Sequence, residues 1–164
     1  MKKLTSLLLI FALALMLSLP AFAVSTDPVA SATLGEVVHT EYYSDGSYVE
    51  TVISEGISSP GETRGTQTKS GTKYDIFYNA NGVSLWRVEI TGTFTYDGST
   101  ATCTNVTKAT SIYDSAWKVT AESCSKSGNK AMGSFTVKRY VLLVPVQTEN
   151  VSLTLTCSAN GTLS

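Results

Sequence analysis

Residues 83–107 constrain the fold of this chain most, because their local sequence pattern alone predicts a β-hairpin. Apolar and small polar residues alternate as far as Asp97-Gly98 and alternate again after it. The Asp-Gly dipeptide favours a two-residue type I′ turn, which joins antiparallel strands. Side chains alternate between the two faces of a strand. The first strand should therefore have one apolar face, made of Trp86, Val88, Ile90, Gly92 and Phe94.

The same turn sets a cross-strand register that places Cys103 on this apolar face. With two residues in the turn, the expected pairs are Phe94 with Ala101, Gly92 with Cys103 and Ile90 with Asn105. Gly92 has no side chain, so in this register it leaves room for the thiol of Cys103.

Residues 1–23 have the organisation of a secretory signal peptide. A short basic start precedes an apolar run over residues 7–19, which is too short to span a bilayer comfortably. Small residues occupy the cleavage positions that end at Ala23. We predict cleavage after Ala23, a flexible lead-in over residues 24–33 and a single domain over residues 34–164.

The chain after the signal peptide is slightly acidic, because two of the 12 basic residues precede the cleavage point and all 13 acidic residues follow it. This balance gives no electrostatic case for binding nucleic acid or an anionic membrane. Ser, Thr and aromatic residues recur, while helix-favouring stretches are missing, which favours strands and turns. We predict an all-β fold, an antiparallel β-sandwich of about eight strands with an Ig-like or jelly-roll-like arrangement. No second apolar stretch is long enough to predict a membrane span.

A second Asp-Gly dipeptide, Asp45-Gly46, predicts a hairpin near the start of the domain. A two-residue turn would pair Tyr43 with Tyr48 and Glu41 with Glu50. Directly opposed like charges are unfavourable in a sheet. This register therefore requires solvent screening, a cation between the carboxylates, or a shift.

Residues 141–144 are apolar at every position, which is the pattern of a strand covered on both faces. Pro145 cannot donate a ladder hydrogen bond, so it predicts a bulge or an edge position directly after this run.

Three cysteines in an exported chain allow one disulfide and one free thiol, with three alternative pairings. Cys103 faces inward in the register above, and Cys157 continues the apolar series of the last strand. Cys124 is out of phase with the apolar residues before it. We predict a Cys103–Cys157 disulfide and a free Cys124, which leaves a Cys124-linked dimer open.

Candidate catalytic residues are few. His39 is the only histidine, and it lies in a strand pattern without a nucleophile motif nearby, so an ordinary strand histidine is the simpler interpretation. Cys124 could act as a nucleophile, although Glu122 opposes thiolate formation. Glu41 and Glu50 could form a glycosidase pair or a weak calcium site. We predict no cofactor, and for the carboxylates a structural role is favoured.

Four tyrosines are stronger candidates for binding. Tyr43 and Tyr48 are expected side by side on the face of the first hairpin that points away from the apolar residues, and Tyr74 and Tyr78 take similar positions on the third strand. Exposed aromatic rings bind the apolar faces of sugars, and they also stabilise exposed sheet faces as cross-strand pairs.

Several short motifs resemble those of a group of short exported proteins of Gram-positive bacteria: Leu85-Trp86, TGTFTYDG over residues 91–98, Cys103, SAWK over residues 115–118, and LTLTCSANG over residues 153–161. The resemblance covers roughly residue 66 onward. It implies export and a bacterial source, and it carries no functional residue over to this chain.

The leading hypothesis is a secreted, extracellular and non-enzymatic binding module whose partner is a glycan, a cell-wall polymer or a protein. A secreted wall or glycan hydrolase is the first alternative, and a released bacteriocin-like effector is the second.

Overall fold

The computed structural model describes residues 35–60 and 65–164. The predicted signal peptide, residues 1–23, and the lead-in over residues 24–33 lie outside the described residues.

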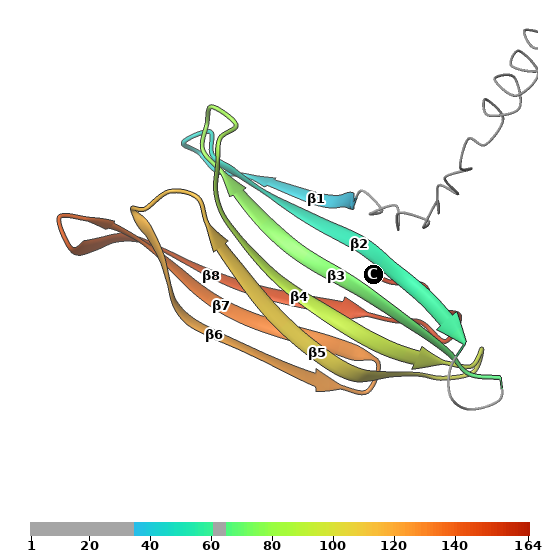
Figure 1. Cartoon of the computed structure of the whole chain (residues 1–164). Helices are drawn as coiled ribbons and strands as arrows, with labels where there is room; N and C mark the ends of the chain where they lie inside the picture. The colour runs from blue at the N-terminus through green and yellow to red at the C-terminus, as the bar shows by residue number, and fades with distance from the viewer. Residues whose placement is uncertain (1–34, 61–64) are drawn as a thin grey trace, which may run out of the picture. The chain divides into compact units, whose positions relative to one another are not determined.

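The described chain is all-β, as predicted, and forms two antiparallel sheets without a helix (Figure 1). The five-stranded sheet has the order β1-β2-β3-β4-β5 and the three-stranded sheet the order β6-β7-β8. Their bounds are β1 Glu36–Tyr42, β2 Tyr48–Pro60, β3 Gln67–Tyr78, β4 Ser84–Tyr96, β5 Ala101–Ile112, β6 Trp117–Ser127, β7 Lys130–Val141 and β8 Val144–Thr156. Both sheets follow chain order, whereas Ig-like and jelly-roll domains are connected by Greek keys. The Ig-like or jelly-roll-like arrangement is therefore wrong.

The apolar faces of the two sheets meet in one core. Every second residue of β4 is buried from Trp86 to Phe94, so the predicted apolar face is confirmed. The second sheet contributes Phe135, Val137, Leu153 and Leu155. Each large apolar side chain stabilises the fold by about 1.5–3 kcal/mol on full burial.

Two glycines allow close approach between β4 and β7. A Cβ atom on Gly133 would lie 2.4 Å from Ile90 Cγ2, and one on Gly92 would lie 2.9 Å from the Cβ of Ala131. Gly92 thus makes room for the ring of Phe94 and for the opposite sheet, and not for Cys103.

The predicted β4–β5 hairpin forms, but its turn is longer than expected. Four residues, 97–100, separate the two strands, and Cys103 pairs with Phe94, so the Gly92–Cys103 pair is wrong. The cause is the side chain of Asp97, whose Oδ1 accepts hydrogen bonds from the backbone N–H of Ser99 at 2.9 Å and of Thr100 at 2.7 Å. Cys103 still faces the core, because Phe94 does.

The first hairpin differs from its expected register by one residue. Tyr42 pairs with Tyr48, and Glu41 pairs with Val49. Asp45 Oδ1 accepts hydrogen bonds from the backbone and hydroxyl of Ser47 at 3.0 Å and 2.6 Å, which widens the turn. The conflict between opposed glutamates disappears in this register.

Residues 141–144 do not form a covered strand. Leu142 and Leu143 make a two-residue turn between β7 and β8, and the run is exposed to solvent. An apolar run occurs both in buried strands and in exposed turns, so the pattern alone could not separate them.

Cys103 and Cys157 are both buried, which confirms their predicted inward placement. The predicted disulfide is absent, since all three cysteines are free thiols. Cys103 Sγ lies 3.2 Å from the carbonyl oxygen of Asn105, and Cys157 Sγ lies 3.4 Å from that of Ser158. Each thiol is thus turned toward a backbone carbonyl.

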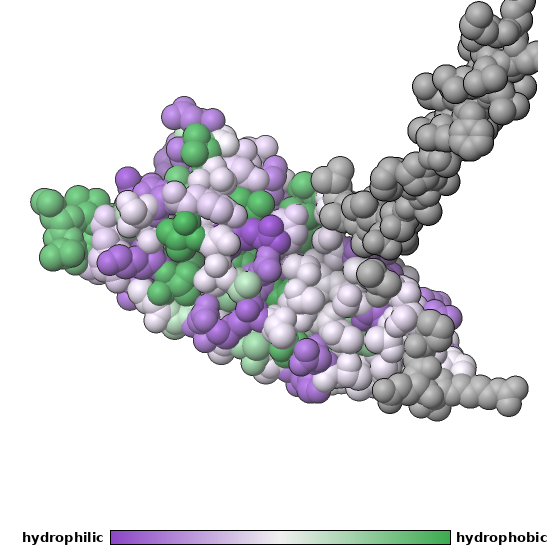
Figure 2. Space-filling model, viewed as in Figure 1, coloured by the Kyte–Doolittle hydropathy of each residue, from purple (hydrophilic) through white to green (hydrophobic). Residues whose placement is uncertain are grey.

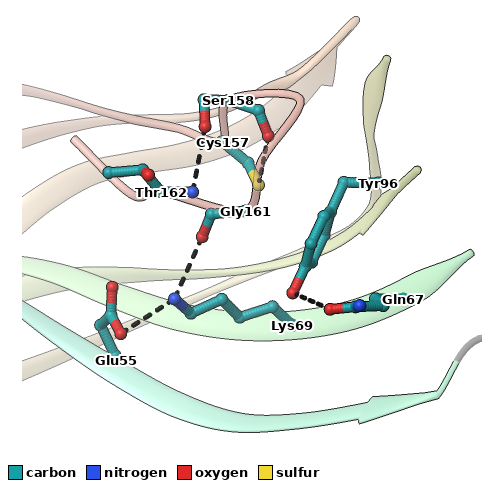
Figure 3. Close-up of polar contacts among 8 residues, drawn as sticks. All are labelled: Glu55, Gln67, Lys69, Tyr96, Cys157, Ser158, Gly161 and Thr162. Carbon is teal, nitrogen blue, oxygen red and sulfur yellow. Dashed lines mark hydrogen bonds and ion pairs between the residues drawn. The ribbon is translucent and has the colours of Figure 1, made fainter. Parts of the chain in front are cut away.

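The C-terminal segment folds back onto the five-stranded sheet (Figure 3). Lys69 Nζ donates a hydrogen bond to the carbonyl oxygen of Gly161 at 3.0 Å and forms an ion pair with Glu55 at 2.8 Å. Ser158 Oγ accepts a hydrogen bond from the backbone N–H of Thr162 at 3.0 Å, which closes the turn. The last residues therefore become part of the folded domain.

Candidate functional site

The face of the five-stranded sheet that points away from the core carries a group of aromatic and charged side chains. We call it the tyrosine face. Its members are Tyr42, Glu50, Tyr48, Tyr74, Tyr78, Arg87 and Glu89. The register brings them together, because Tyr48 pairs with both Tyr42 and Tyr78. Phe77, which precedes Tyr78 in the chain, points into the core, so Tyr78 points away from it. The face spans β1 to β4.

Three rings form a row across β1, β2 and β3. Tyr48 stacks on Tyr78 with ring centroids 4.8 Å apart and planes 15° apart, and Tyr42 tilts against Tyr48 at 5.5 Å and 37°. Tyr48 is therefore covered on both sides. Tyr42 belongs to an edge strand and is 74% exposed, so one of its ring faces is open to a ligand.

A carboxylate lies beside the row. Glu50, on the next residue row of β2, lies close enough to the phenol of Tyr78 to raise its pKa through charge and hydrogen bonding. Burial, followed by the negative charge of Glu50, raises the pKa of Tyr78 above its usual value. The phenol therefore stays protonated and the carboxylate oxygens offer hydrogen-bond acceptors at the surface.

Arg87 supplies the positive charge of the tyrosine face. Its guanidinium lies 3.7 Å from the ring centroid of Tyr74 and forms an ion pair with Glu89. Its Nε is buried and has no hydrogen-bond partner among the described residues. Arg87 thus covers the ring of Tyr74, while keeping donor capacity.

Tyr43, predicted as part of this face, points to the other side of the sheet. Its ring contacts the edge of Phe77 at 5.7 Å and packs against the core. Burial, with smaller contributions from Glu149, Glu41 and Asp75, raises its pKa. Tyr42 takes its place, and only the one-residue register shift separates the two, so sequence alone pointed to the wrong neighbour.

Glu41 and Glu50 do not form a carboxylate pair. Glu41 pairs with Val49, which contacts the core, whereas Glu50 lies on the opposite face beside Tyr78. The glycosidase and calcium alternatives for these two residues therefore gain no support from their placement, and the favoured structural role stays a prediction. Within residues 35–60 and 65–164, no cluster of three His, Cys, Asp or Glu residues could hold a metal ion.

His39 and Asp75 lie in one row on the inner side of β1, β2 and β3. His39 is exposed and pairs with Thr51, which pairs with Asp75. Burial raises the pKa of Asp75, and a hydrogen bond from Thr51 and the charges of Lys73 and His39 oppose this shift. Thr51 separates the histidine from the carboxyl group, so the row does not have the order of a hydrolase triad.

Cys124 is half-buried in β6 and pairs with Gly133. Its Sγ lies 3.9 Å from the carbonyl oxygen of Val106. Glu122, two residues away, forms an ion pair with Lys108. A base that could activate the thiol does not appear in these contacts, and Cys124 stays a candidate for cross-linking to a second chain.

A pocket of about 190 Å³ opens between the two sheets at the end that carries the β1–β2, β3–β4 and β7–β8 turns. Phe77, Leu85 and Trp117 contribute apolar surface, and Arg139 and Gln147 contribute polar surface. The polar side chains of the adjacent turns are already used, since Asp45, Asn79 and Asp114 accept backbone hydrogen bonds from residues that follow them. These three side chains therefore hold the turns around the pocket in place.

No protein-family model, curated protein or solved structure matches this chain. Across the two described ranges, no helix is long and apolar enough to cross a membrane. The functional conclusion therefore depends on the residues of the tyrosine face and on their geometry.

Proposed function

We propose that the protein is a secreted, non-enzymatic binding module, built as a β-sandwich of two meander sheets, that holds an extracellular glycan or cell-wall polymer on its tyrosine face. The observation that carries this proposal is the open ring of Tyr42 at the end of the stacked pair Tyr48 and Tyr78. Two side chains of opposite charge, Glu50 and Arg87, lie on the next row of the same face.

This arrangement suits a sugar polymer for two reasons. Tyrosine combines a flat apolar ring with a hydroxyl group, so it contacts the C–H surface of a sugar and hydrogen-bonds to its rim. Cross-strand stacking fixes the rings before binding, which reduces the entropy lost on complex formation. The row covers about 10 Å, two strand spacings, and its end at Tyr42 presents one open ring face to a sugar.

The geometry of the site does not support the alternative that the protein is a hydrolase. Its two carboxylates, Glu41 and Glu50, lie on opposite faces of the sheet. A glycosidase needs its two carboxyl groups in one cleft, flanking the same glycosidic bond at a separation of about 5–10 Å.

Co-sedimentation of the mature protein with insoluble polysaccharides and purified Gram-positive cell walls tests this proposal. Tyr42→Ala should weaken binding at least tenfold, because it removes the open ring. Tyr113→Ala, which removes an exposed tyrosine outside the tyrosine face, is the matched control and should bind normally. Full binding by the Tyr42 variant would reject this site. Retention by walls stripped of glycan but not of protein would instead indicate a protein partner.

A further inference from the structure

The turn between β7 and β8 presents an apolar tip to solvent. Leu142 and Leu143 are 93% and 89% exposed, more than any other large hydrophobic residue of the described chain. We define the apolar tip as Val141, Leu142, Leu143, Val144 and Val146, all of which are exposed. Figure 2 shows this group of hydrophobic residues at the end of the hairpin that Figure 1 places beyond the neighbouring turns.

The backbone of the tip is unfavourable for leucine. Leu142 and Leu143 have φ angles of 48° and 70°, and no other non-glycine residue in the described ranges has a positive φ. In this left-handed conformation the Cβ atom crowds the following carbonyl, so Asn and Gly are the usual residues. Two exposed leucines thus occupy positions where more stable choices exist. Strain of this kind indicates a role other than folding stability.

Behind the tip lie an aromatic ring and two cations. Tyr140 directly precedes the tip, and Lys118 Nζ lies 5.6 Å from its ring centroid. Lys118 pairs across the strands with Lys138, so two like charges are directly opposed. The three ion pairs of the described residues include neither lysine. Opposed cations without an anion are unfavourable, and an external anion would relieve their repulsion.

This order of side chains matches the layers of a lipid bilayer. Aliphatic side chains enter the hydrocarbon, tyrosine lies at the interface, and lysine reaches the anionic headgroups. A protein partner fits less well, since a stable protein interface uses about 20–30 residues on each side and the tip offers a short convex turn. The acidic residues elsewhere in the chain have little effect here, because salt screens charges beyond about 8–10 Å.

We propose that the apolar tip inserts into the outer layer of an anionic lipid bilayer, with Tyr140, Lys118 and Lys138 at the headgroups. This membrane contact is separate from the tyrosine face, so the module would connect a lipid surface with its other ligand. The overall negative charge argues against electrostatic attraction over long distances. Insertion of aliphatic side chains therefore provides most of the affinity, and the two lysines add a local preference for anionic lipid.

Vesicle sedimentation with the mature protein tests the proposal, using phosphatidylcholine vesicles with and without phosphatidylglycerol. A double variant, Leu142→Asn with Leu143→Gly, should reduce partition into vesicles at least tenfold, because two aliphatic side chains no longer leave water. The same variant should raise the melting temperature, since Asn-Gly suits a type I′ turn. Opposite effects on binding and on stability exclude misfolding as the cause. Val37→Thr, which removes an exposed valine on β1, is the control and should bind normally.

A tryptophan probe gives a second readout. Trp86 and Trp117 are both buried, so Leu143→Trp adds the one indole that can change environment at the tip. Its emission should shift to the blue with anionic vesicles. Failure of the native protein to bind any vesicle would overturn the proposal, as would unchanged binding by the double variant. Concentration-dependent self-association that the double variant loses, without vesicle binding, would assign the tip to a second copy of the chain.

Discussion

Leu163, the penultimate residue, lies directly over Gly71 in the middle of β3. A Cβ atom at position 71 would come within 2.2 Å of Leu163 Cδ1. Leu163 is buried in the same core as Cys157, with which it forms an isolated β-bridge. A glycine far away in the sequence therefore makes room for the end of the chain.

Gly71→Ala should destabilise the protein by about 1 kcal/mol, because Leu163 must move out of its position. The free energy of unfolding in urea measures this effect. A double-mutant cycle with Leu163→Ala is the control. The two substitutions together should cost less than the sum of the single changes, since the clash needs both side chains. Strict additivity would contradict the contact.

Tyr43→Ala should lower the stability of the protein more than Tyr42→Ala does. Tyr43 packs against Phe77, so its loss should lower the free energy of unfolding by about 2 kcal/mol. Tyr42 is mostly exposed, so its loss should cost less than about 1 kcal/mol. Urea denaturation of both variants provides the measurement. A larger cost for Tyr42→Ala than for Tyr43→Ala would instead support the register expected from a two-residue turn.

Asp75 should make the protein less stable as the pH rises. Burial raises its pKa above the usual value of 3.8, so the folded protein holds the proton more tightly than the unfolded chain does. Raising the pH from about 3.8 through the folded pKa therefore lowers the free energy of unfolding at this position. Asp75→Asn should raise the melting temperature at pH 7, and the gain should shrink in acid.

The contribution of Asp97 to stability should have the opposite pH dependence. Hydrogen bonds from the backbone of Thr100 and Ser99 lower its pKa. Its contribution to stability is present above the unfolded pKa and is lost as the pH falls through the folded value. Asp97→Ala should therefore lower the melting temperature at pH 7 and have less effect in acid. The same sign for both aspartates would contradict this assignment of environments.

The three cysteines should differ in reactivity. Burial raises the pKa values of Cys103 and Cys157, which keeps both thiols protonated and shielded. An alkylating reagent should label Cys124 in the folded protein, and the other two only after unfolding. Mass spectrometry of the labelled peptides gives the answer. Rapid labelling of Cys103 in the folded state would contradict its burial. Two cysteines that resist labelling after unfolding until reductant is added would reveal the disulfide predicted from sequence.

The strand pattern and the core could be predicted because they depend on alternation, which the sequence displays directly. The buried face of β4 and the inward direction of Cys157 are examples. The register of the two hairpins could not be predicted, because Asp45 and Asp97 each accept backbone hydrogen bonds that lengthen their turns. An Asp-Gly dipeptide is compatible both with the expected two-residue turn and with the longer turn observed. A shift of one residue exchanges the faces of a strand, and this replaced Tyr43 by Tyr42 in the candidate site.

The apolar tip was missed for a different reason. A short hydrophobic run has the same composition in a buried strand as in an exposed turn. The distinguishing property is the positive φ of Leu142 and Leu143, which belongs to the backbone and has no signal in the side chains.

The order of the strands has a consequence for how the chain folds. Each strand pairs with its neighbour in sequence, and the chain passes between the two sheets at one place in the described ranges, residues 113–116. Hairpins of this kind close short loops and form early, so docking of the two finished sheets should limit the folding rate. A single cut at residues 113–116 would leave two pieces, each holding one whole sheet. Neither piece could bury its apolar face alone, so mixing the two should restore the folded domain from its halves.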